Sequence, residues 1–538
     1  MNIFFFKRYD IEKLIVIISF LLISVDGFSN IFKYRIYLKD KGSYKVEDFK
    51  VDDLLSSRAQ QRRIKENAAV DEYDLPIFKT YLKELESMGL KIVVKSKWLN
   101  SVVVSSDDSD ILPSLKALPF VEDAKLVWKE NGETQSLFLE ASELDEIKAV
   151  LSRKQIEVHN GFKLHNAGYK GDGIEIAVID AGFLNVDRID AINKNVVGSY
   201  DFVDPQGDIY STHHHGCQVL SVMASSDTSV LCGSAPNASY WLLRSEDSSS
   251  EFPVEEDYWV AAAEFADSVG VDIINSSLGY YLFDDGVDNY SQKDLNGETA
   301  FITKGANIAA SKGILVVVSA GNEGQDKWKK ISFPSDSKKV LTVGAVNDKN
   351  EPAYFTGVGF TAPYVKPDVA GVGLPAYVIN TEGRLATNTG TSFSAPIVCG
   401  LAACLWQALP EKKSYEIMSI LKQNSSMFLT PDSLVGYGVP NVYSAYTFAT
   451  GIDVFEEYAS IDVLPIDESG NIWRVVGLSK DNQNTLVEVI TMEGGIVYNS
   501  KVNSENYSLN LSNLLPGLYV VRVAGKNINH SKIINKTL

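Results

Sequence analysis

Five short apolar segments in the middle of the chain constrain the fold more than any other feature. They are rich in Val, Ile, Leu and other apolar residues, and helix-like stretches such as 255–268 and 305–312 separate them. Continuous apolar strands are typical of parallel sheets whose two faces are covered by helices. The segments are residues 174–179, 239–243, 271–274, 314–318 and 340–346. The sequence therefore predicts a doubly wound α/β domain with a mostly parallel sheet, and sites in such sheets lie at the carboxyl ends of strands.

The regions on either side follow different patterns. A chain of 538 residues exceeds what one hydrophobic core usually supports, so two to four domains are expected. Before residue 130, strand-like runs (34–38, 91–94, 101–105, 124–128) surround helical patterns (77–87, 111–118), which indicates a small α+β domain. After about residue 450, period-two strands at 473–476, 487–490 and 517–523 indicate an all-β sandwich.

The N-terminus has the pattern of a signal peptide. Lys7, Arg8 and Lys13 precede an apolar run over 14–25, which is too short to span a bilayer comfortably. We expect cleavage after Gly27 and export, with an uncleaved N-terminal anchor as the alternative. The predicted division is a signal peptide (1–27), an α+β domain with a charged connector (28–150), an α/β domain (151–450) and a β-sandwich (451–538).

Charge and cysteine content exclude some functions. The formal net charge is −19, and this acidic balance argues against nucleic acid as a partner. No cysteine pair has zinc spacing, so the four cysteines are given no metal role. Cys399 and Cys404 fall in one predicted helix and are expected to be buried packing residues, while a Cys217–Cys232 bridge is left open.

Asp180 and His215 are the first two candidate functional residues. Residues 176–182 form a predicted buried strand that ends at Asp180, although Asp also commonly starts turns. His215 precedes a predicted helix over 218–224, and we expect the following Gly216 to let a substrate backbone approach. The adjacent His213 and His214 invite a zinc interpretation, but neighbouring residues diverge and no carboxylate spacing supports it, so both are expected to be solvated loop residues.

Ser392 is the third candidate. The segment 390–396 reads G-T-S-F-S-A-P and opens an apolar helix expected over 397–409, which places Ser392 where backbone N–H groups favour negative charge. Pro396 is expected in the first helical turn, where proline is tolerated. An N-cap is the commoner use of such serines. Together, however, the three segments supply the hydroxyl, imidazole and carboxylate that hydrolysis by a serine requires.

These three segments resemble those of the subtilases, whose triad follows the chain order Asp, His, Ser. Asp180 lies in a D-x-G segment, His215 in a variant of H-G-T-x-V, and Ser392 in G-T-S-x-S/A-x-P. The second segment departs from the family pattern because Cys217 stands where Thr is usual, which affects local packing and removes no catalytic atom. The resemblance implies that Asp180, His215 and Ser392 are catalytic.

Three further segments resemble the family. Residues 316–324 read VVVSAGNEG, and the resemblance implies that Asn322 is an oxyanion-hole donor. Ser277, Leu278 and Gly279 resemble the strand that pairs with substrate, where the bare Gly backbone would admit a peptide. The run 366–369 (K-P-D-V) resembles a segment near the active site and is given only a structural role.

The flanking regions also resemble parts of secreted subtilases. Residues 31–130 have the size and rhythm of a propeptide that assists folding and blocks the cleft, with cleavage expected in the connector before Gln155; a plain adhesion or packing domain is the alternative. Residues 514–523 and 532–536 are similar to the C-terminal sorting domain of type IX secretion cargo. There Gly517 makes a turn, and Leu518 to Val521 build a two-faced strand. An ordinary accessory sandwich that binds carbohydrate or substrate is the alternative.

The resulting hypothesis is a secreted or cell-surface bacterial serine endopeptidase made as a pre-pro-enzyme. Its expected partners are polypeptide substrates, its own propeptide and outer-membrane secretion machinery, with no nucleic acid. No cofactor is required, and calcium stays open as a structural ion without assigned ligands. The rivals are a catalytically silent adhesion module, which would normally lack a triad residue, and an esterase using the same groups. Side-chain preference cannot be read, because loops such as 280–298 are long.

Overall fold

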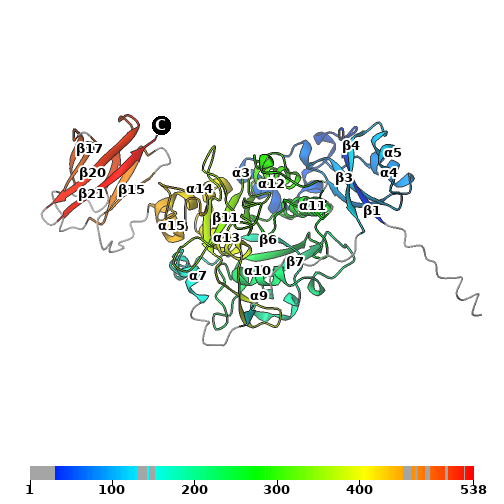
Figure 1. Cartoon of the computed structure of the whole chain (residues 1–538), viewed down its shortest axis with the longest axis horizontal. Coiled ribbons are helices and arrows are strands. Elements are labelled where there is room, and N and C mark those ends of the chain that lie inside the picture. Colours follow the sequence, from blue (N-terminus) through cyan, green and yellow to red (C-terminus); the bar gives the residue numbers. More distant parts are fainter. Residues whose placement is uncertain are drawn as a thin grey trace, which may run out of the picture.

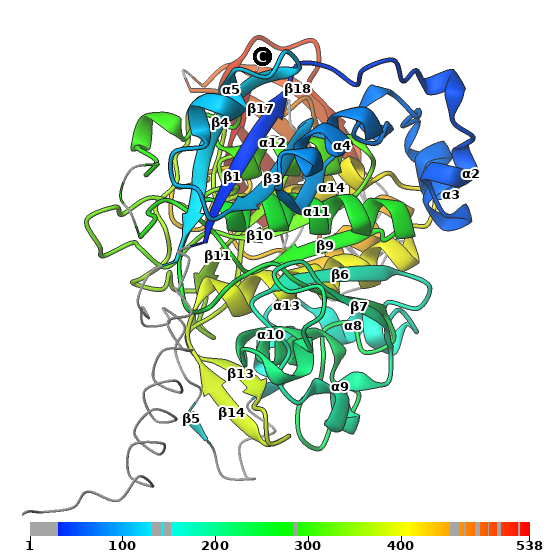
Figure 2. The ribbon, with the colours of Figure 1, turned by 90° about the vertical axis from the view of Figure 1, so that its right-hand side faces the viewer.

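A seven-stranded parallel sheet forms the centre of the protein in the computed structural model (Figure 2). The structure describes residues 31–130, 142–143, 152–284, 286, 288–451, 462–466, 470–478, 485–492, 494–502, 507–525 and 528–537. Strand order is β12-β11-β10-β9-β6-β8-β7. The strands are β6 (Glu175–Asp180), β7 (Val196–Asp201), β8 (Ser239–Arg244), β9 (Ile273–Ser276), β10 (Leu315–Ser319), β11 (Leu341–Val346) and β12 (Val369–Val372). The predicted doubly wound α/β class is confirmed.

The chain reverses direction across the sheet between β6 and β9. From β6 it passes to β7 and β8 on one side, and then it returns to β9, β10, β11 and β12 on the other. Such a reversal opens a crevice at the carboxyl ends of the two central strands. Asp180 ends β6 and Ser277 follows β9, so both candidate residues lie at this crevice.

Helices cover both faces of the sheet (Figure 2). On one face, α10 (His215–Ala224) and α13 (Thr391–Ala408) pack with the inward side chains of β6 and β8 in one apolar core. On the other face, α11 (Val254–Val269) and α12 (Phe301–Ser311) pack in a second core. The remaining elements of this region are α7 (Lys154–Glu157), α8 (Gly161–Asn166), α9 (Asp190–Asn193), β13 (Ala376–Ile379), β14 (Leu385–Asn388), α14 (Ser414–Gln423) and α15 (Val442–Thr450).

Sequence patterns predicted five of these strands within a few residues and missed β7 and β12. The side chains of β7 are mostly exposed or partly exposed, because it is an edge strand with little apolar content. β12 is only four residues long and contains Gly371. Neither strand carries a continuous apolar run of the kind that marks a buried strand.

The N-terminal region forms a separate four-stranded antiparallel sheet. Its order is β2-β3-β1-β4, built from β1 (Phe32–Leu38), β2 (Lys91–Ser96), β3 (Ser101–Ser106) and β4 (Val121–Lys129). The helices α4 (Lys79–Ser87) and α5 (Leu112–Lys116) complete its core, so the predicted α+β fold is confirmed. Two helices were missed, α2 (Val51–Leu54) and α3 (Ser57–Glu66), and α3 packs on the central region (Figure 1).

The C-terminal region is all-β, as predicted. One sheet contains β15 (Asp462–Pro465), β16 (Ile472–Val476) and β19 (Tyr507–Asn510); the other contains β18 (Ile496–Val502), β17 (Thr485–Thr491), β20 (Gly517–Gly525) and β21 (Ile528–Lys536). In β20 the side chains of Tyr519 and Val521 are buried while that of Leu518 is exposed. This alternation confirms the two-faced strand.

All four cysteines are buried free thiols, so the structure contains no Cys217–Cys232 bridge. Burial raises the pKa of the Cys217 thiol to about 12. Among the described residues, one helix, Thr391–Ala408, is long and apolar enough to cross a membrane; 89% of it is buried, which marks it as a core helix. The signal peptide, with its expected cut after Gly27, lies outside the described residues, as does most of the connector.

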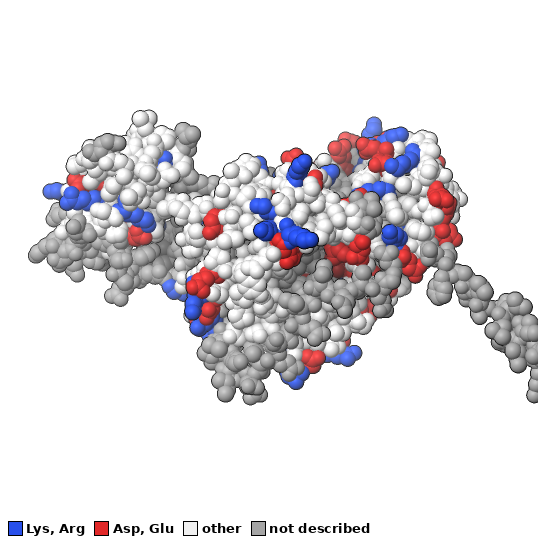
Figure 3. All heavy atoms as spheres, viewed as in Figure 1, with Lys and Arg blue, Asp and Glu red and all other residues white. Residues whose placement is uncertain are grey.

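Charged side chains of both signs are interspersed on the face of the molecule shown in Figure 3. The net charge of −19 is therefore not concentrated there in one acidic patch.

Candidate active site

Asp180 and His215 are hydrogen-bonded to each other inside the crevice. Asp180 is fully buried at the end of β6, and its Oδ1 lies 2.8 Å from His215 Nδ1 and also accepts the Ala181 amide at 2.8 Å. His215 is the first residue of α10 and is 4% exposed. A carboxylate on Nδ1 fixes the imidazole orientation and leaves Nε2 as the nitrogen that can exchange a proton.

Gly216 serves a different purpose from the one predicted. A side chain at this position would collide with the Gly182 carbonyl and the Phe183 ring. The glycine therefore lets the start of α10 approach the turn after β6, which brings His215 to Asp180. The expectation that Gly216 makes room for a substrate backbone is not supported by this packing.

His213 and His214 are partly buried rather than solvated as predicted. The His215 amide donates to His213 Nδ1 at 3.2 Å, at the first turn of α10. Burial, together with the neighbouring His214 and His215, lowers the pKa of His213 to about 3. His213 is thus a neutral acceptor that helps to start the helix.

Ser392 is the second residue of α13 and is 8% exposed. The ring of the next residue, Phe393, lies 5.8 Å from the His215 ring, which places the three predicted segments together. The prediction that Pro396 lies in the first turn is wrong, because α13 begins at Thr391 and Pro396 is inside the helix. Proline has no N–H, so it cannot donate to the carbonyl four residues earlier, which is that of Ser392.

Ser277 replaces this missing helical hydrogen bond. Its Oγ donates to the Ser392 carbonyl at 2.8 Å, and Ser392 Oγ lies 3.3 Å from the Ser277 carbonyl oxygen. The segment after β9 is therefore bonded directly to the backbone and side chain of Ser392. Sequence analysis assigned Ser277 to substrate pairing and missed this contact, because it depends on a proline 119 residues further along the chain.

Asn322 lies beyond the end of β10 and faces the start of α13. Its Oδ1 accepts the Thr391 amide at 2.8 Å and the Thr391 hydroxyl at 3.0 Å. With the oxygen held in this way, the Nδ2 donor is directed away from Thr391. Asn322 is exposed and lines the same cavity as Ser392, so this donor is accessible to a bound group.

A cavity of about 650 Å³ connects these groups. Ser277, Leu278 and Gly279 form one wall, and Gly321, Asn322 and Ser392 lie on the same cavity. A side chain at Gly279 would collide with Ser332 Oγ, so the glycine is needed for the fit between two walls of the cavity. Residues between 246 and 255, from the loop after β8 and the first turn of α11, also line it, and sequence analysis did not identify them.

The run 366–369 has a structural role, as predicted. Lys366 is buried, and its Nζ donates to Asp368 Oδ2 at 2.6 Å, to the Val340 carbonyl at 2.8 Å and to Thr342 Oγ1 at 3.0 Å. This cation joins β11 and the approach to β12.

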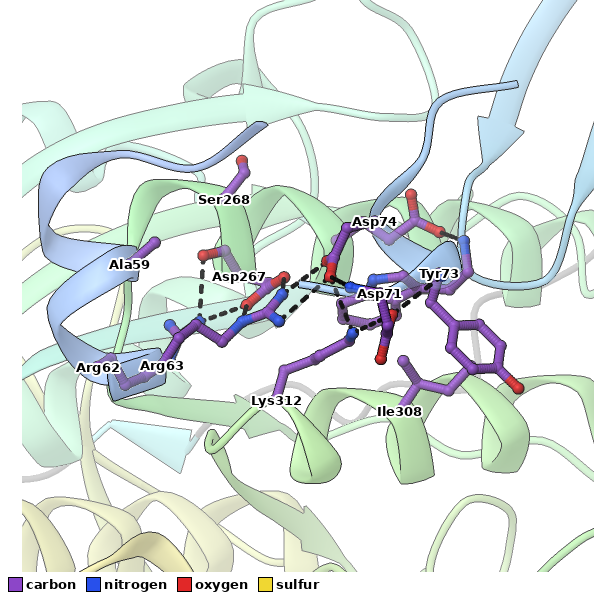
Figure 4. Close-up of polar contacts among 12 residues, drawn as sticks. Ala59, Arg62, Arg63, Asp71, Tyr73, Asp74, Asp267, Ser268, Ile308 and Lys312 are labelled. Atoms are coloured by element: carbon purple, nitrogen blue, oxygen red, sulfur yellow. Dashed lines mark hydrogen bonds and ion pairs between the residues drawn. The ribbon is translucent and has the colours of Figure 1, made fainter. Parts of the chain in front are cut away.

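The N-terminal region binds the central domain through buried charges. Figure 4 shows Arg62 and Arg63 of α3 directed at Asp267 of α11, with Arg63 donating to its Oδ2 at 2.5 Å. Arg63 also donates to Asp74 at 2.8 Å, and Lys312 of the central domain donates to Asp74 at 3.0 Å. Charges that are fully buried in this way need their partners, so the two regions are complementary.

Comparison with known proteins gives a consistent assignment for three parts of the chain. Residues 171–438 match the family described as the Subtilase family. Residues 33–138 match the Peptidase S8 propeptide domain of Bacteroidota, and residues 474–536 match a secretion system C-terminal sorting domain.

Individual relatives match about half of the chain. Subtilisin NAT from Bacillus subtilis subsp. natto is 29% identical over 287 residues, covering 52% of this chain and 68% of its own. The thermophilic serine proteinase from Bacillus sp. (strain AK1) is 31% identical over 278 residues, covering 51% of this chain and 62% of its own. In fold, the chain is similar to the epidermin leader peptide processing serine protease from Staphylococcus aureus, with a TM-score of 0.56 and 19% identity over 78% of this chain and 98% of that one.

Proposed function

The central domain of this chain belongs to the subtilase family, and on that premise we propose that Asp180, His215 and Ser392 are its catalytic triad. The chain is a serine-type endopeptidase with a propeptide domain and a C-terminal secretion sorting domain, and it is secreted or attached to the bacterial cell surface. The observation that carries the proposal is the 2.8 Å contact of Asp180 with His215 beside the segment that holds Ser392.

The proposed reaction passes through an acyl-enzyme. His215 takes the proton of Ser392 Oγ as this oxygen attacks the scissile carbonyl, and Asp180 stabilises the imidazolium that forms. His215 then protonates the leaving amine as the carbon–nitrogen bond breaks. Water attacks the ester in the second half, with His215 again taking the proton and returning it to Ser392. These steps use only protein groups and water, so the proposal invokes no cofactor.

Asn322 is proposed as an oxyanion donor. Its amide oxygen is engaged by Thr391, and its Nδ2 is accessible from the cavity that Ser392 lines. Ser392 also lies at the N-terminal end of α13, where backbone N–H groups lack helical acceptors. Loss of one such donor costs about 10²- to 10³-fold in kcat.

Ser277, Leu278 and Gly279 are proposed as the edge that pairs with an extended peptide. The segment continues β9 and lies on the wall of the cavity beside Ser392. Main-chain pairing of this kind requires a peptide and favours peptidase over esterase activity.

The flanking regions support a pre-pro-enzyme with the proposed divisions at residues 27, 150 and 450. The N-terminal domain is proposed to inhibit the enzyme until the connector is cut, and its buried contacts with α11 support tight binding. The described strand β5 (Ser142–Glu143) of the connector pairs with β14, which leads to Ser392. The C-terminal sandwich is proposed to direct export by type IX machinery, and calcium is left as a structural ion without assigned ligands.

Casein hydrolysis by the purified full chain and by Ser392→Ala, with intact mass recorded over time, tests the proposal. We expect the unmodified protein to lose its N-terminal domain and to cleave casein, and Ser392→Ala to do neither. Equal inertness of both proteins would favour a silent binding module or processing by another protease.

A further inference from the structure

The cavity beside Ser392 is unusually acidic. Of the 20 residues that line it, seven are Asp or Glu, and none is Lys or Arg. Three of the glutamates have oxygens within 4.8 Å of one another: Glu246 and Glu251 come from the loop between β8 and α11, and Glu255 is the second residue of α11. Glu323 follows Asn322 directly on the other side of the cavity. A cavity that reaches the reacting serine is thus lined by carboxylates from two separate segments.

Where the structure gives these four carboxylates hydrogen-bond partners, the partners are neutral groups rather than cations. Within the described parts of the chain, no Lys or Arg forms an ion pair with Glu246, Glu251, Glu255 or Glu323. Tyr280 Oη and Ser245 Oγ donate to Glu246, the latter at 3.0 Å. Glu255 accepts two backbone amides, those of Asp247 at 2.8 Å and Phe252 at 2.9 Å.

Glu323 is the least satisfied of the four. Its Oε2 is buried and has no hydrogen-bond partner among the described residues. The same oxygen lies against Gly321, where a side chain would collide with it, so the carboxylate is folded back beside the residue that precedes Asn322. An unsatisfied buried carboxylate oxygen is costly and needs a donor.

Burial and mutual repulsion raise the pKa values of this group. The pKa of Glu246 and that of Glu323 each rise to about 7, mainly because of burial. The pKa values of Glu251 and Glu255 also rise, through burial first and then through neighbouring carboxylates. A cation entering the cavity would favour the ionised forms and relieve both effects.

We propose that this cavity is the subsite that selects substrates with a Lys or Arg side chain next to the cleaved bond. Glu323 and Glu251 act as specificity-determining residues, since both line the cavity and neither has a cation partner. The proposal rests on the proposed function of Ser392. When the substrate backbone is held along Ser277 to Gly279, a basic substrate side chain can supply N–H donors and positive charge to these carboxylates.

A substrate side chain fits the cavity better than a metal ion does. Calcium takes six to eight oxygen ligands at about 2.3–2.6 Å. Both oxygens of Glu255 already accept backbone amides, and Oε1 of Glu246 accepts two hydroxyl groups. The cavity, at about 650 Å³, is also large enough for a side chain and continues to Ser392.

The test compares peptide p-nitroanilides that differ only in the residue before the cleaved bond: Arg, Lys, Leu or Glu. For the matured enzyme, we expect kcat/KM for Arg or Lys to exceed that for Leu by about 10- to 100-fold, the range of a charge-assisted hydrogen bond. Glu323→Gln and Glu251→Gln should each reduce the Arg-to-Leu ratio about 10-fold or more. Glu298→Gln, an exposed change outside the cavity, should leave the ratio unchanged.

The outcomes separate this proposal from the proposed function. Ser392-dependent cleavage with no preference for basic residues would overturn the subsite and leave the peptidase assignment intact. A calcium-dependent rise in thermal stability that Glu251→Gln abolishes, with the Arg-to-Leu ratio unchanged, would assign the glutamates to a metal ion and also overturn it. An Arg-to-Leu ratio that stays unchanged in both Glu323→Gln and Glu251→Gln would also overturn the proposed subsite.

Discussion

Two groups of buried or partly buried carboxylates in the central domain differ in their pairing with cations: arginines pair with most of the first group and with none of the second. On α11, four carboxylates face the N-terminal domain: Asp257, Glu264 and Asp267 accept hydrogen bonds from it, and Glu256 lies near its Arg35. Arg35 donates to Asp257 at 2.8 Å and lies 3.8 Å from Glu256. Arg62 and Arg63 both pair with Asp267. Glu264 accepts hydrogen bonds from the Ser96 hydroxyl and from the amides of Lys97 and Trp98. In the cavity beside Ser392, no Lys or Arg of the described residues pairs with any of the four glutamates, and Glu246 and Glu255 accept hydrogen bonds from hydroxyl and amide groups.

This difference indicates which surfaces the folded chain completes by itself. The α11 face is matched by its own N-terminal domain, so its charges are fully used while that domain is attached. No Lys or Arg of the described residues enters the cavity, so its carboxylates can still pair with a cation of the substrate. Paired carboxylates hold domains together, whereas unpaired ones beside a nucleophile are available to a substrate.

The largest expected effect comes from breaking the paired group. Arg63→Met, made in the inactive Ser392→Ala chain, removes a buried donor from Asp267 and Asp74. We expect it to lower the free energy of unfolding by about 3–5 kcal/mol, because it leaves buried carboxylates short of positive charge. Denaturant unfolding measures the change.

A matched change on the surface provides the control. Lys116 pairs with Asp123 at 2.7 Å, but both side chains are about half exposed, so Lys116→Met should change stability little. Equal effects of the two substitutions would contradict the distinction between buried and exposed pairs.

Removing a carboxylate that lacks a cation partner should stabilise the protein, which is the opposite of the effect of Arg63→Met. Burial raises the pKa of Glu323 from 4.5 to about 7, so the unfolded chain loses this proton at lower pH than the folded one. Stability therefore falls as pH rises from about 4.5 to 7, and the full penalty is present above pH 7. In the Ser392→Ala chain, Glu323→Gln should stabilise by about 1–3 kcal/mol at pH 8 and have almost no effect at pH 4.5.

Thermal or denaturant unfolding at both pH values measures this effect. Asp74→Asn is the paired counterpart, because Arg63 and Lys312 hold the pKa of Asp74 below its usual value against the effect of burial. It should destabilise at pH 8 and lose part of that effect as pH falls through the range of Asp74. Destabilisation by Glu323→Gln at pH 8 would show that Glu323 is paired after all.

The smallest expected effect is a pH dependence of substrate selectivity. Glu246 and Glu323 become ionised as pH rises through about 7, so kcat/KM for Arg over Leu should increase by about 10-fold between pH 5.5 and 8.5. Using the ratio cancels any pH dependence of the catalytic step, which both substrates share. A constant ratio would contradict the role of these carboxylates. The charged or titratable groups that face them are Tyr280, Tyr281, Asp180, Arg244, Glu251, Glu255 and Asp326.

Local sequence patterns accounted for much of the fold and for the candidate site residues. Segments rich in apolar residues predicted β6, β8, β9, β10 and β11, because a strand buried on both faces needs apolar side chains at most positions. Motifs at the ends of these strands and at the starts of α10 and α13 identified the candidate site residues. β7 was missed because it is a largely exposed edge strand, and α3 because its buried Arg62 and Arg63 meet partners far away in the sequence.

The sequence by itself determined the type of each main element and the chemistry at its end, since both depend on residues a few positions apart. Tertiary structure decided which distant groups meet: Ser277 on the Ser392 carbonyl, Arg63 on Asp267, and residues between 246 and 255 on the same cavity as Glu323. Whether a carboxylate is paired or left open depends on contacts between segments, and the cost of burying charge makes that choice decisive.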